Sequence, residues 1–384
     1  MDYKKESLFI HKKYKGKIEI KGKISIKNKD DLSIAYTPGV AEVSKLLQKN
    51  PKYAYTHSIK ANTILVVSDG SAVLGLGNIG PLGALPVMEG KALLFKNFGN
   101  VDAYPICLNT QDAEEIIKTI KNIAPAFGGI NLEDISAPKC FLIEERLKKE
   151  LSIPVFHDDQ HGTAIVVLAA LLNALLVVKK KKENIKIVIN GAGSAGQAIL
   201  YLLKKAGFSS EEIIMLDSKG IISKKRNDLD FYKQKIAKNT NKNSEIGNLS
   251  YAIKKADVFI GVSVKDVLTR EMIFNMNENP IVFAMANPNP EISYKEIKKI
   301  NVGVFGTGRS DYPNQINNVL VFPGFFRGLL DGQVKKITDK MKINASYAIA
   351  NLIPKSKLNK NYIIPNPFDK RVALAVALAV KNTK

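Results

Sequence analysis

The chain has 384 residues, 45% of them hydrophobic and 24% charged, and its formal net charge at pH 7 is +21. These values are ordinary for a globular protein of about two domains. The two cysteines, Cys107 and Cys140, exclude a disulfide framework and favour a reducing compartment, the cytoplasm.

The excess of positive charge raises nucleic acid and an anionic membrane surface as partners. The basic residues, however, are mostly dispersed lysines without interleaved aromatic residues, and no zinc-finger or RNA-binding motif is present. We therefore predict a solvated basic surface and no nucleic-acid partner. The positive field still attracts small anionic substrates.

The first 30 residues are rich in lysine, and the alternation in KIEIKGKISIK predicts a short amphipathic hairpin. Tyr36 follows shortly, directly before a Thr-Pro-Gly turn. In such an exposed loop a phenol can act as a general acid, and a buried structural tyrosine is the alternative.

Two segments match the pattern G-x-G-x-x-G, residues 73–80 and residues 189–196. In the first, a turn at Asp69-Gly70 interrupts the upstream strand and Pro86 falls within the following helical pattern, which argues against a dinucleotide loop. We predict instead that its glycines permit a close backbone approach. Pro81 then opens a helix that carries Lys91 to a defined place.

Acidic residues occur in pairs after two apolar strands, Glu133-Asp134 and Asp158-Asp159. Carboxyl ends of parallel strands are where sites form, and carboxylates without cysteine favour a hard cation, Mg²⁺ or Mn²⁺. The alternative for either pair alone is helix capping. The neighbouring His157 and His161 are interpreted as ordinary hydrogen-bonded histidines.

An apolar run at residues 163–178 is followed by four lysines, as in a membrane stop-transfer signal. The run falls short of the roughly 20 residues that span a bilayer, and it contains Asn173. We predict a buried helix and no membrane partner.

The second glycine loop has the full context of a dinucleotide site. An apolar strand, residues 185–189, leads into the loop, an amphipathic helix follows, and a second strand ends in Asp217. The predicted cofactor-binding residues are Gly191, Gly193, Ser194, Ala195, Gly196 and Asp217. Asp217 favours NAD because its charge opposes a 2′-phosphate, but Lys219 and the basic residues 223–226 leave NADP open.

Strands that alternate with helices predict an α/β protein. We expect an N-terminal α/β substrate and metal domain at residues 1–160. A Rossmann-type NAD(P)-binding domain with a parallel sheet and C-terminal helices is expected at residues 161–384.

Taken together, these motifs resemble the short bacterial form of malic enzyme. The resemblance runs from about residue 30 to the C-terminus and rests on these segments: YTPGVAEV, LGLGNIGPLGALPVMEGKALLFKNFGNVDAYPI, GGINLEDI, IPVFHDDQHGTA, GAGSAGQAI, MANPNPEI and GTGRSDYPNQINNVLVFPG. It implies oxidative decarboxylation of (S)-malate to pyruvate and CO₂, with reduction of NAD or NADP and a requirement for Mg²⁺ or Mn²⁺. It also implies a homodimer, and the N-terminal 30 residues are candidates to pack on the partner subunit.

The resemblance also implies roles for individual residues. Tyr36 is the implied acid and Lys91 the implied base, which burial and a nearby cation would hold neutral. Asp158 holds Lys91 in place. The implied metal ligands are Glu133, Asp134 and Asp159, and the implied malate contacts are Asn287 with Asn317 or Asn318.

The chain departs from the long, eukaryotic-type members of the family at Ala72, where those carry an arginine that holds a substrate carboxylate. The distal carboxylate of malate must therefore find other donors here. Two other readings stay open: a malolactic enzyme that keeps NAD bound and releases lactate, and a binding protein with a degenerate site that uses its basic surface. Because every expected acid, base and metal position is filled, the degenerate site is disfavoured.

Overall fold

Two parallel sheets organise the chain, and the computed structural model describes residues 2–73 and 75–383. The first sheet has the strand order β2-β1-β3-β4, and all its neighbouring strands are parallel. Its strands are β1 (Thr63–Ser68), β2 (Asp102–Cys107), β3 (Gly129–Leu132) and β4 (Val155–His157). Its connecting helices are α5 (Gly80–Gly99), α6 (Ala113–Ile123) and α7 (Lys139–Glu150).

The second sheet has the strand order β10-β9-β8-β5-β6-β7. Every neighbouring pair is parallel except β6 and β7, and the order read from β7 is that of a dinucleotide-binding fold, with the switch point between β5 and β8. Its strands are β5 (Ile187–Asn190), β6 (Ile213–Asp217), β7 (Gly220–Ile221), β8 (Val258–Gly261), β9 (Ile281–Ala284) and β10 (Val304–Thr307). Its helices are α9 (Ser194–Lys205), α10 (Phe231–Asn239), α11 (Leu249–Ala252), α12 (Arg270–Phe274) and α13 (Tyr294–Ile297).

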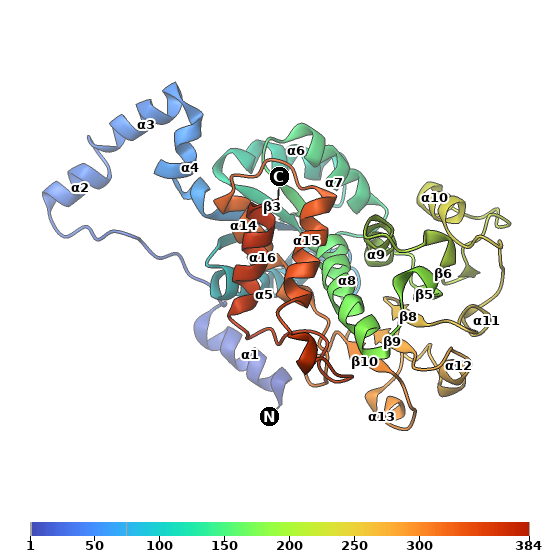
Figure 1. Cartoon of the computed structure of the whole chain (residues 1–384). Coiled ribbons are helices and arrows are strands. Elements are labelled where there is room, and N and C mark those ends of the chain that lie inside the picture. The colour runs from blue at the N-terminus through green and yellow to red at the C-terminus, as the bar shows by residue number, and fades with distance from the viewer. Residues whose placement is uncertain (1, 74, 384) are drawn as a thin grey trace.

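Helix α8 (Asp158–Val178) lies between the two sheets and contacts α9 and α15 (Figure 1). It is long and apolar enough to cross a membrane, but most of its residues are buried inside the protein. Asn173 donates hydrogen bonds to the carbonyls of Ala350 and Ile363, both at 2.9 Å. The asparagine within the apolar run therefore ties α8 to the C-terminal segment.

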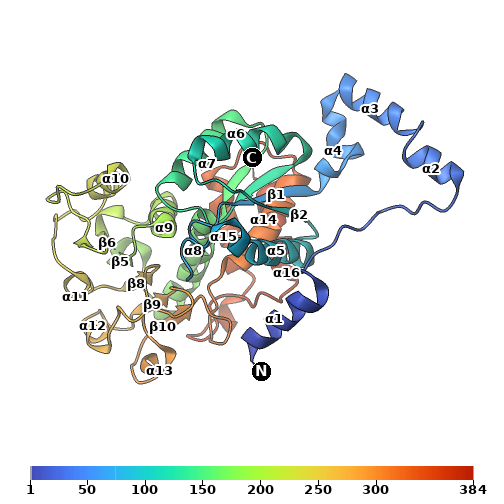
Figure 2. The same cartoon turned by 180° about the vertical axis from the view of Figure 1, so that it is seen from behind.

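The C-terminal helices are α14 (Phe322–Asp331), α15 (Asp339–Ala350) and α16 (Arg371–Lys381). Helices α14 and α16 pack on α5, beside the first sheet, although they follow the second sheet in the sequence. The view from behind shows this return of the chain (Figure 2). The first sheet, with the residues predicted for the substrate, is thus covered by helices from both ends of the chain.

The N-terminal segment projects from this body as an arm (Figures 1 and 2). It contains α2 (Lys29–Ala35), α3 (Val40–Lys49) and α4 (Ala54–His57). Helix α1 (Tyr3–Tyr14) lies beside the body instead, and Lys17, shortly after it, donates to the Pro86 carbonyl of α5 at 2.6 Å. These four helices bury none of their residues. The predicted hairpin is wrong, because residues 18–27 contain no strand. The alternating isoleucines, such as Ile20 at 87% exposure, have no apolar surface within the chain on which to pack.

Short 3₁₀ helices complete the connections. They are η1 (Pro51–Tyr53), η2 (Ile59–Ala61), η3 (Ala124–Ala126), η4 (Lys182–Asn184), η5 (Ser210–Glu212), η6 (Asn318–Leu320) and η7 (Lys355–Lys357). The last strand of the second sheet leads through η6 into α14, and this brings the C-terminal part of the chain back to the acidic end of α8.

Candidate active site

Lys91 is buried in α5, and two carboxylates hold its ammonium group. Its Nζ donates to Glu133 Oε1 at 3.0 Å and to Asp158 Oδ2. Its Nζ also lies 3.8 Å from the centre of the Phe322 ring. Glu133 directly follows β3 and Asp158 begins α8, so the ends of two neighbouring strands converge on one amine.

The electrostatics of this cluster differ from the expectation of a neutral lysine. Burial alone would lower the pKa of Lys91, but the carboxylates of Asp158 and Glu133 outweigh it and raise that pKa above its usual value. Burial raises the pKa of both carboxyl groups, against the opposing effect of Lys91. The two carboxylates therefore favour the protonated form of Lys91 more than burial opposes it.

The other two predicted metal ligands, Asp134 and Asp159, lie near the group formed by Lys91, Glu133 and Asp158. The backbone N–H of Asp134 donates to Asp159 Oδ2 at 2.8 Å, and Asp159 Oδ1 is buried with no hydrogen-bond partner among the described residues. Burial raises the pKa of Asp159 and of Glu133. Among residues 2–73 and 75–383, no group of three or more acidic, histidine or cysteine side chains is arranged so that it could hold a metal ion. The oxygen-only donors and the unpartnered oxygen fit a hard cation.

A cavity of about 260 Å³ opens beside Asp159. The predicted substrate residues Asn287, Asn317 and Asn318 line it, together with Ala72 and Gly75. The Asn318 amide donates to Asp158 Oδ2 at 2.5 Å, whereas the side chain of Asn317 accepts from the Val319 N–H at 2.9 Å. The described lining contains no arginine or lysine, so the side-chain donors available to a carboxylate are the asparagine amides and the hydroxyls of Thr163, Ser194 and Ser263.

The first glycine loop forms part of this wall. A side chain at Gly75 would meet the Pro288 ring at 2.7 Å, and φ is +75° there, so glycine alone permits the contact between the loop and the segment after β9. The predicted close approach is confirmed at Gly75, whereas a side chain at Gly77 or Gly80 would meet no atom within 4 Å. Pro81 stands in the first turn of α5 as predicted, and Pro86 is accommodated inside that helix.

The second glycine loop borders a larger cavity of about 780 Å³. Gly191 and Gly193 line it at one end and Asp217 at the other, and Ser194 begins α9, so a helix N-terminus faces the space. A side chain at Gly196 would meet the Gly191 carbonyl at 1.8 Å, so this glycine lets the helix pack closely on the loop. Ser194 and Ala195 line the smaller cavity.

The two cavities adjoin, because Ala137, Gly193 and Ser263 line both of them. The predicted malate contacts, Asp159 and every predicted coenzyme residue except Gly196 line one or both cavities. Lys91 bonds Glu133 and Asp158. Among the described residues, the predicted metal ligands do not form a group arranged to hold a metal ion, and Tyr36 lies elsewhere.

Tyr36 caps the C-terminal end of α2, and 67% of its surface is exposed. Helix α2 lies on the projecting arm, away from the body that contains α5 and α8 (Figure 1). Within one chain the predicted acid and the predicted base are therefore apart. The sequence could not show this separation, because it does not reveal that the arm projects away from the body.

Sequence reasoning missed a buried acid that supports the site. Glu291 accepts hydrogen bonds from the backbone N–H groups of Ser263 and Ala286, both at 3.0 Å, and it joins the loops after β8 and β9. The first of these loops lines both cavities, and the second carries Asn287. The signal available in the sequence was a glutamate directly after the asparagine-proline motif.

A second group of buried charges lies at the start of α8. His161 Nε2 lies 2.8 Å from Glu144 Oε1, and its Nδ1 lies 3.1 Å from Lys342 Nζ. Burial lowers the pKa of His161 to about 3, so the ring is neutral and links the two charged groups. Hydrogen bonding of His161 is confirmed. For His157 the same prediction is wrong: both ring nitrogens are buried without a hydrogen-bond partner among the described residues, and Nδ1 lies 3.9 Å from Asp159 Oδ2.

Two family models match the chain. Residues 15–148 match the malic enzyme N-terminal domain, and residues 160–384 match the malic enzyme NAD binding domain. Among curated relatives, the bifunctional malic/malolactic enzyme of Bacillus subtilis is 55% identical and covers 99% of this chain and 92% of its own. The NAD-dependent malic enzyme of Geobacillus stearothermophilus is 56% identical over 95% of this chain and 76% of its own.

Solved structures agree in fold. The NAD-dependent malic enzyme of Thermotoga maritima has a TM-score of 0.93 and 47% sequence identity, and the alignment covers 98% of this chain and 99% of that one. The malic enzyme of Entamoeba histolytica has a TM-score of 0.95 and 40% identity, over 99% of this chain and 80% of that one.

Proposed function

This chain belongs to the malic enzyme family, and from this premise we propose how its residues carry out the oxidative decarboxylation of (S)-malate to pyruvate and CO₂ with NAD(P) as the oxidant. One observation carries the assignment. The coenzyme cavity at the second glycine loop adjoins the cavity lined by Asp159 and the asparagines, and the two share Ala137, Gly193 and Ser263 in their walls. A hydride donor placed among the asparagines therefore lies next to the space for a nicotinamide ring.

Lys91 is the proposed base. Hydride leaves C2 of malate only as the C2 hydroxyl loses its proton, so a proton acceptor is needed at that oxygen. Asp158 acts as a positioning residue, because it holds both the Lys91 amine and the Asn318 amide. Lys91 accepts a proton only after it has released its own, and the two acids beside it set how readily that occurs.

The proposed metal ligands are Glu133, Asp134 and Asp159, which would bind Mg²⁺ or Mn²⁺. When bound, the cation supplies positive charge that stabilises the developing negative charge on the C2 oxygen during decarboxylation. It would also neutralise the carboxylates that raise the pKa of Lys91, and so favour the neutral amine.

Asn287, Asn317 and Asn318 are proposed to bind malate. Their amide N–H groups can replace the arginine whose position is occupied by Ala72, which also lines the cavity. Amides bind a carboxylate more weakly than a guanidinium group does, because they lack its charge. We therefore expect the positive field of the chain, with its net charge of +21, to contribute to malate capture.

We propose that the protein is a homodimer in which Tyr36 of one subunit protonates the product enolate in the site of the other. Tyr36 is exposed on an arm that buries none of its helical residues. The arm also exposes Ile34 and Val40 beside Tyr36. Exposed apolar side chains of this kind are stabilised when a second subunit covers them.

For the remaining assignments we propose NAD as the preferred coenzyme, with NADP also accepted, and a cytoplasmic location. The free thiols of Cys107 and Cys140 support a reducing compartment. The dispersed lysines support a protein without a nucleic-acid partner.

The test is absorbance at the reduced-nicotinamide band, with (S)-malate and Mn²⁺ and with NAD and NADP in parallel. A metal-dependent rise is expected with both coenzymes. The printed name of the Bacillus subtilis relative includes a malolactic activity, so lactate is assayed in the same samples. Lactate without net NADH would replace the proposal with the malolactic reaction, and neither product would contradict both.

A further inference from the structure

A third carboxylate, that of Glu144 in α7, holds the chain on both sides of the acidic pair Asp158-Asp159. Its Oε1 accepts a hydrogen bond from the backbone N–H of His157, directly before the pair, at 3.1 Å. His161 follows the pair by two residues, and its Nε2 lies 2.8 Å from Oε1 and 3.1 Å from Oε2. Glu144 therefore bonds the first turn of α8 from outside that helix.

The start of a helix leaves several backbone N–H groups without an acceptor inside the helix. In α8 the N-cap residue is His157, and its side chain makes no capping hydrogen bond. Aspartates in a first turn often stabilise the helix terminus. Asp158 instead accepts hydrogen bonds from Lys91 and from the Asn318 amide. Because Glu144 accepts the N–H of the N-cap residue, the carboxylate of Asp158 is left for the active site.

The side chain of Glu144 is buried, and two lysines balance its charge. Lys148 lies one turn along α7, with its Nζ 2.7 Å from Oε1. The second lysine is reached through His161, whose Nδ1 lies 3.1 Å from Nζ of the buried Lys342 in α15. A neutral imidazole offers one donor and one acceptor, so it fits between a carboxylate and an ammonium group. The carboxylate therefore ties together α7, the first turn of α8 and α15.

On the side of the active site, the first turn of α8 leaves little room for displacement. A side chain at Gly162 would meet Asp158 Oδ1 at 1.9 Å, so this carboxylate lies directly against the turn. Its other oxygen, Oδ2, is shared by Lys91 and Asn318. Asp159, the next residue, lines the substrate cavity. A shift of the turn by about 1 Å would separate these groups, and a misplacement of that size can cost about 100-fold in rate.

We propose that Glu144 is a positioning residue for the reaction, because it fixes the first turn of α8 and with it Asp158 and Asp159. Asp158 then reaches Lys91, and Asp159 faces the substrate cavity. The proposal rests on the proposed function, since it gives Glu144 a task in that same site. In a purely structural role, Glu144 would stabilise the fold, and a folded variant without it would keep an intact site. Stability and site properties measured on the same variants separate the two roles.

Glu144→Gln in the full-length protein is the first variant. An amide has only one acceptor oxygen, and its NH₂ group would face one of the donors that the carboxylate now accepts. We expect kcat for malate-dependent NADH formation to fall by a factor on the order of 30 to 100. Mn²⁺ affinity of the coenzyme-free protein, measured by direct titration, should fall about tenfold or more, as for residues that orient metal ligands. The dissociation constant of NADH should stay within about twofold, because Glu144 does not line the coenzyme cavity.

Glu145→Gln is the matched control. Glu145 is the next residue of α7 and also pairs with a lysine one turn along, Lys149 at 2.6 Å, but both of these side chains are exposed. The control should leave kcat, Mn²⁺ affinity and NADH affinity unchanged, as expected for an exposed ion pair. Urea unfolding followed by circular dichroism measures how much stability each variant loses, and so reports the structural contribution separately.

A pair of variants at His161 gives a second test that does not depend on the folding of Glu144→Gln. His161→Leu removes the donor to Glu144 and the acceptor from Lys342, whereas His161→Gln keeps one donor and one acceptor. We expect His161→Leu to lower kcat about tenfold, which corresponds to one hydrogen bond to a charged group. His161→Gln should restore kcat to within about threefold of the wild type.

A folded Glu144→Gln protein with unchanged kcat and Mn²⁺ affinity overturns the positioning role. Equal kcat values for the two His161 variants overturn it as well. Equal weakening of Mn²⁺ and NADH binding in Glu144→Gln does the same, because it makes Glu144 a residue of the fold only. If the wild-type protein reduces NAD with malate, these outcomes remove the positioning role alone. If it reduces neither NAD nor NADP, the proposed function falls and the positioning role falls with it.

Discussion

The Lys91 ammonium is the charge around which the acidic residues of the site are arranged. Asp158 and Glu133 bond it directly, and Asp159 adds to the surrounding negative potential. This arrangement makes Lys91 both a candidate base and a structural counter-ion. The two roles predict different consequences of its removal.

We expect Lys91→Ala to lower kcat by a factor on the order of 10²–10⁴, the usual contribution of a positioned base. NADH binding should be retained, because Lys91 does not line the coenzyme cavity. The measurement is malate-dependent NADH formation together with NADH titration. Lys96→Ala, which removes a half-exposed lysine from the same helix, is the control. Equal loss of turnover and coenzyme binding would make Lys91 structural only.

Asp159→Asn tests the metal assignment. The substitution removes a charge from the proposed donor set, and Mn²⁺ affinity should fall by more than about tenfold, as is seen even for substitutions next to metal ligands. The measurement is direct Mn²⁺ titration of the coenzyme-free protein, with Glu145→Gln as an exposed control. Unchanged Mn²⁺ binding would remove Asp159 from the ligand set.

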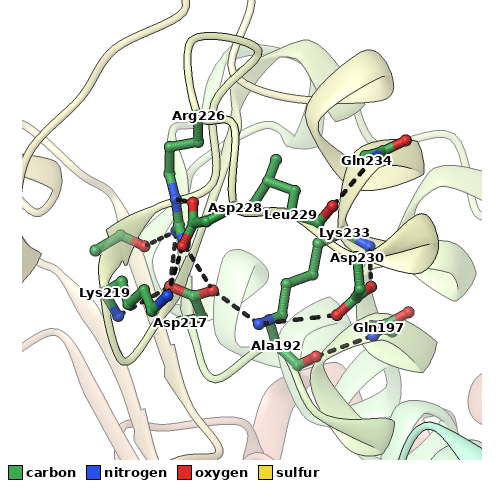
Figure 3. A network of polar contacts seen from close by, with 11 residues as sticks. Ala192, Gln197, Asp217, Lys219, Arg226, Asp228, Leu229, Asp230, Lys233 and Gln234 are labelled. Carbon is green, nitrogen blue, oxygen red and sulfur yellow. Dashed lines mark hydrogen bonds and ion pairs between the residues drawn. The ribbon is translucent and has the colours of Figure 1, made fainter.

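At the residue scale, the sequence predicted those residues whose positions are fixed by a short local motif. Gly196 and Asp217 were predictable because a strand, a glycine turn and a helix fix their geometry within one unit. The pairing of Asp217 with Arg226 (Figure 3) was not, because it depends on how the eight intervening residues, which include β7, turn back toward β6. Glu291 and the contact between His161 and Lys342 were missed for the same reason: their partners come from distant segments.

At the scale of elements, α8 is the helix whose role most depends on packing. Its composition alone fits a membrane span as well as a core, and only the surrounding helices decide between them. The sequence favoured the core because of Asn173, and the structure gives that residue two buried carbonyl partners. The hairpin prediction failed because an alternating pattern forms a strand only where a partner strand and an apolar surface exist.

Asn173→Leu should therefore destabilise the protein although it makes α8 more apolar. Two buried carbonyls, of Ala350 and Ile363, lose a donor, which costs about 2 kcal/mol. The measurement is the midpoint of urea unfolding followed by circular dichroism. Leu176→Ala, at a half-exposed position of the same helix, should change the stability by less than about 0.5 kcal/mol. A stabilised Asn173→Leu protein would contradict the assigned role of the amide.

At the scale of the whole molecule, one chain contains all the residues proposed for catalysis but does not bring them into one site. The coenzyme cavity, Lys91 and the asparagines lie together in the body, whereas Tyr36 lies on the arm. The fold class and the two sheets followed from the alternation of strands and helices. The course of the arm did not, because no local pattern in the sequence shows that its apolar residues stay exposed and do not pack on the body.

Subunit mixing tests this arrangement. Tyr36→Phe and Lys91→Ala should each be inactive alone. If Tyr36 acts across the dimer, a mixed dimer has one site with both substitutions and one site with neither. Random re-association of equal amounts after mild denaturation should therefore restore about a quarter of the wild-type activity per total protein, because half the dimers are mixed. Mixing Lys91→Ala with Asp158→Asn is the control: both residues lie in the body of one chain, so neither site of that mixed dimer is intact. No recovery with Tyr36→Phe would place the acid and the base within a single chain. Recovery in the control would show that regained activity does not report a site shared between subunits, and would contradict the arrangement.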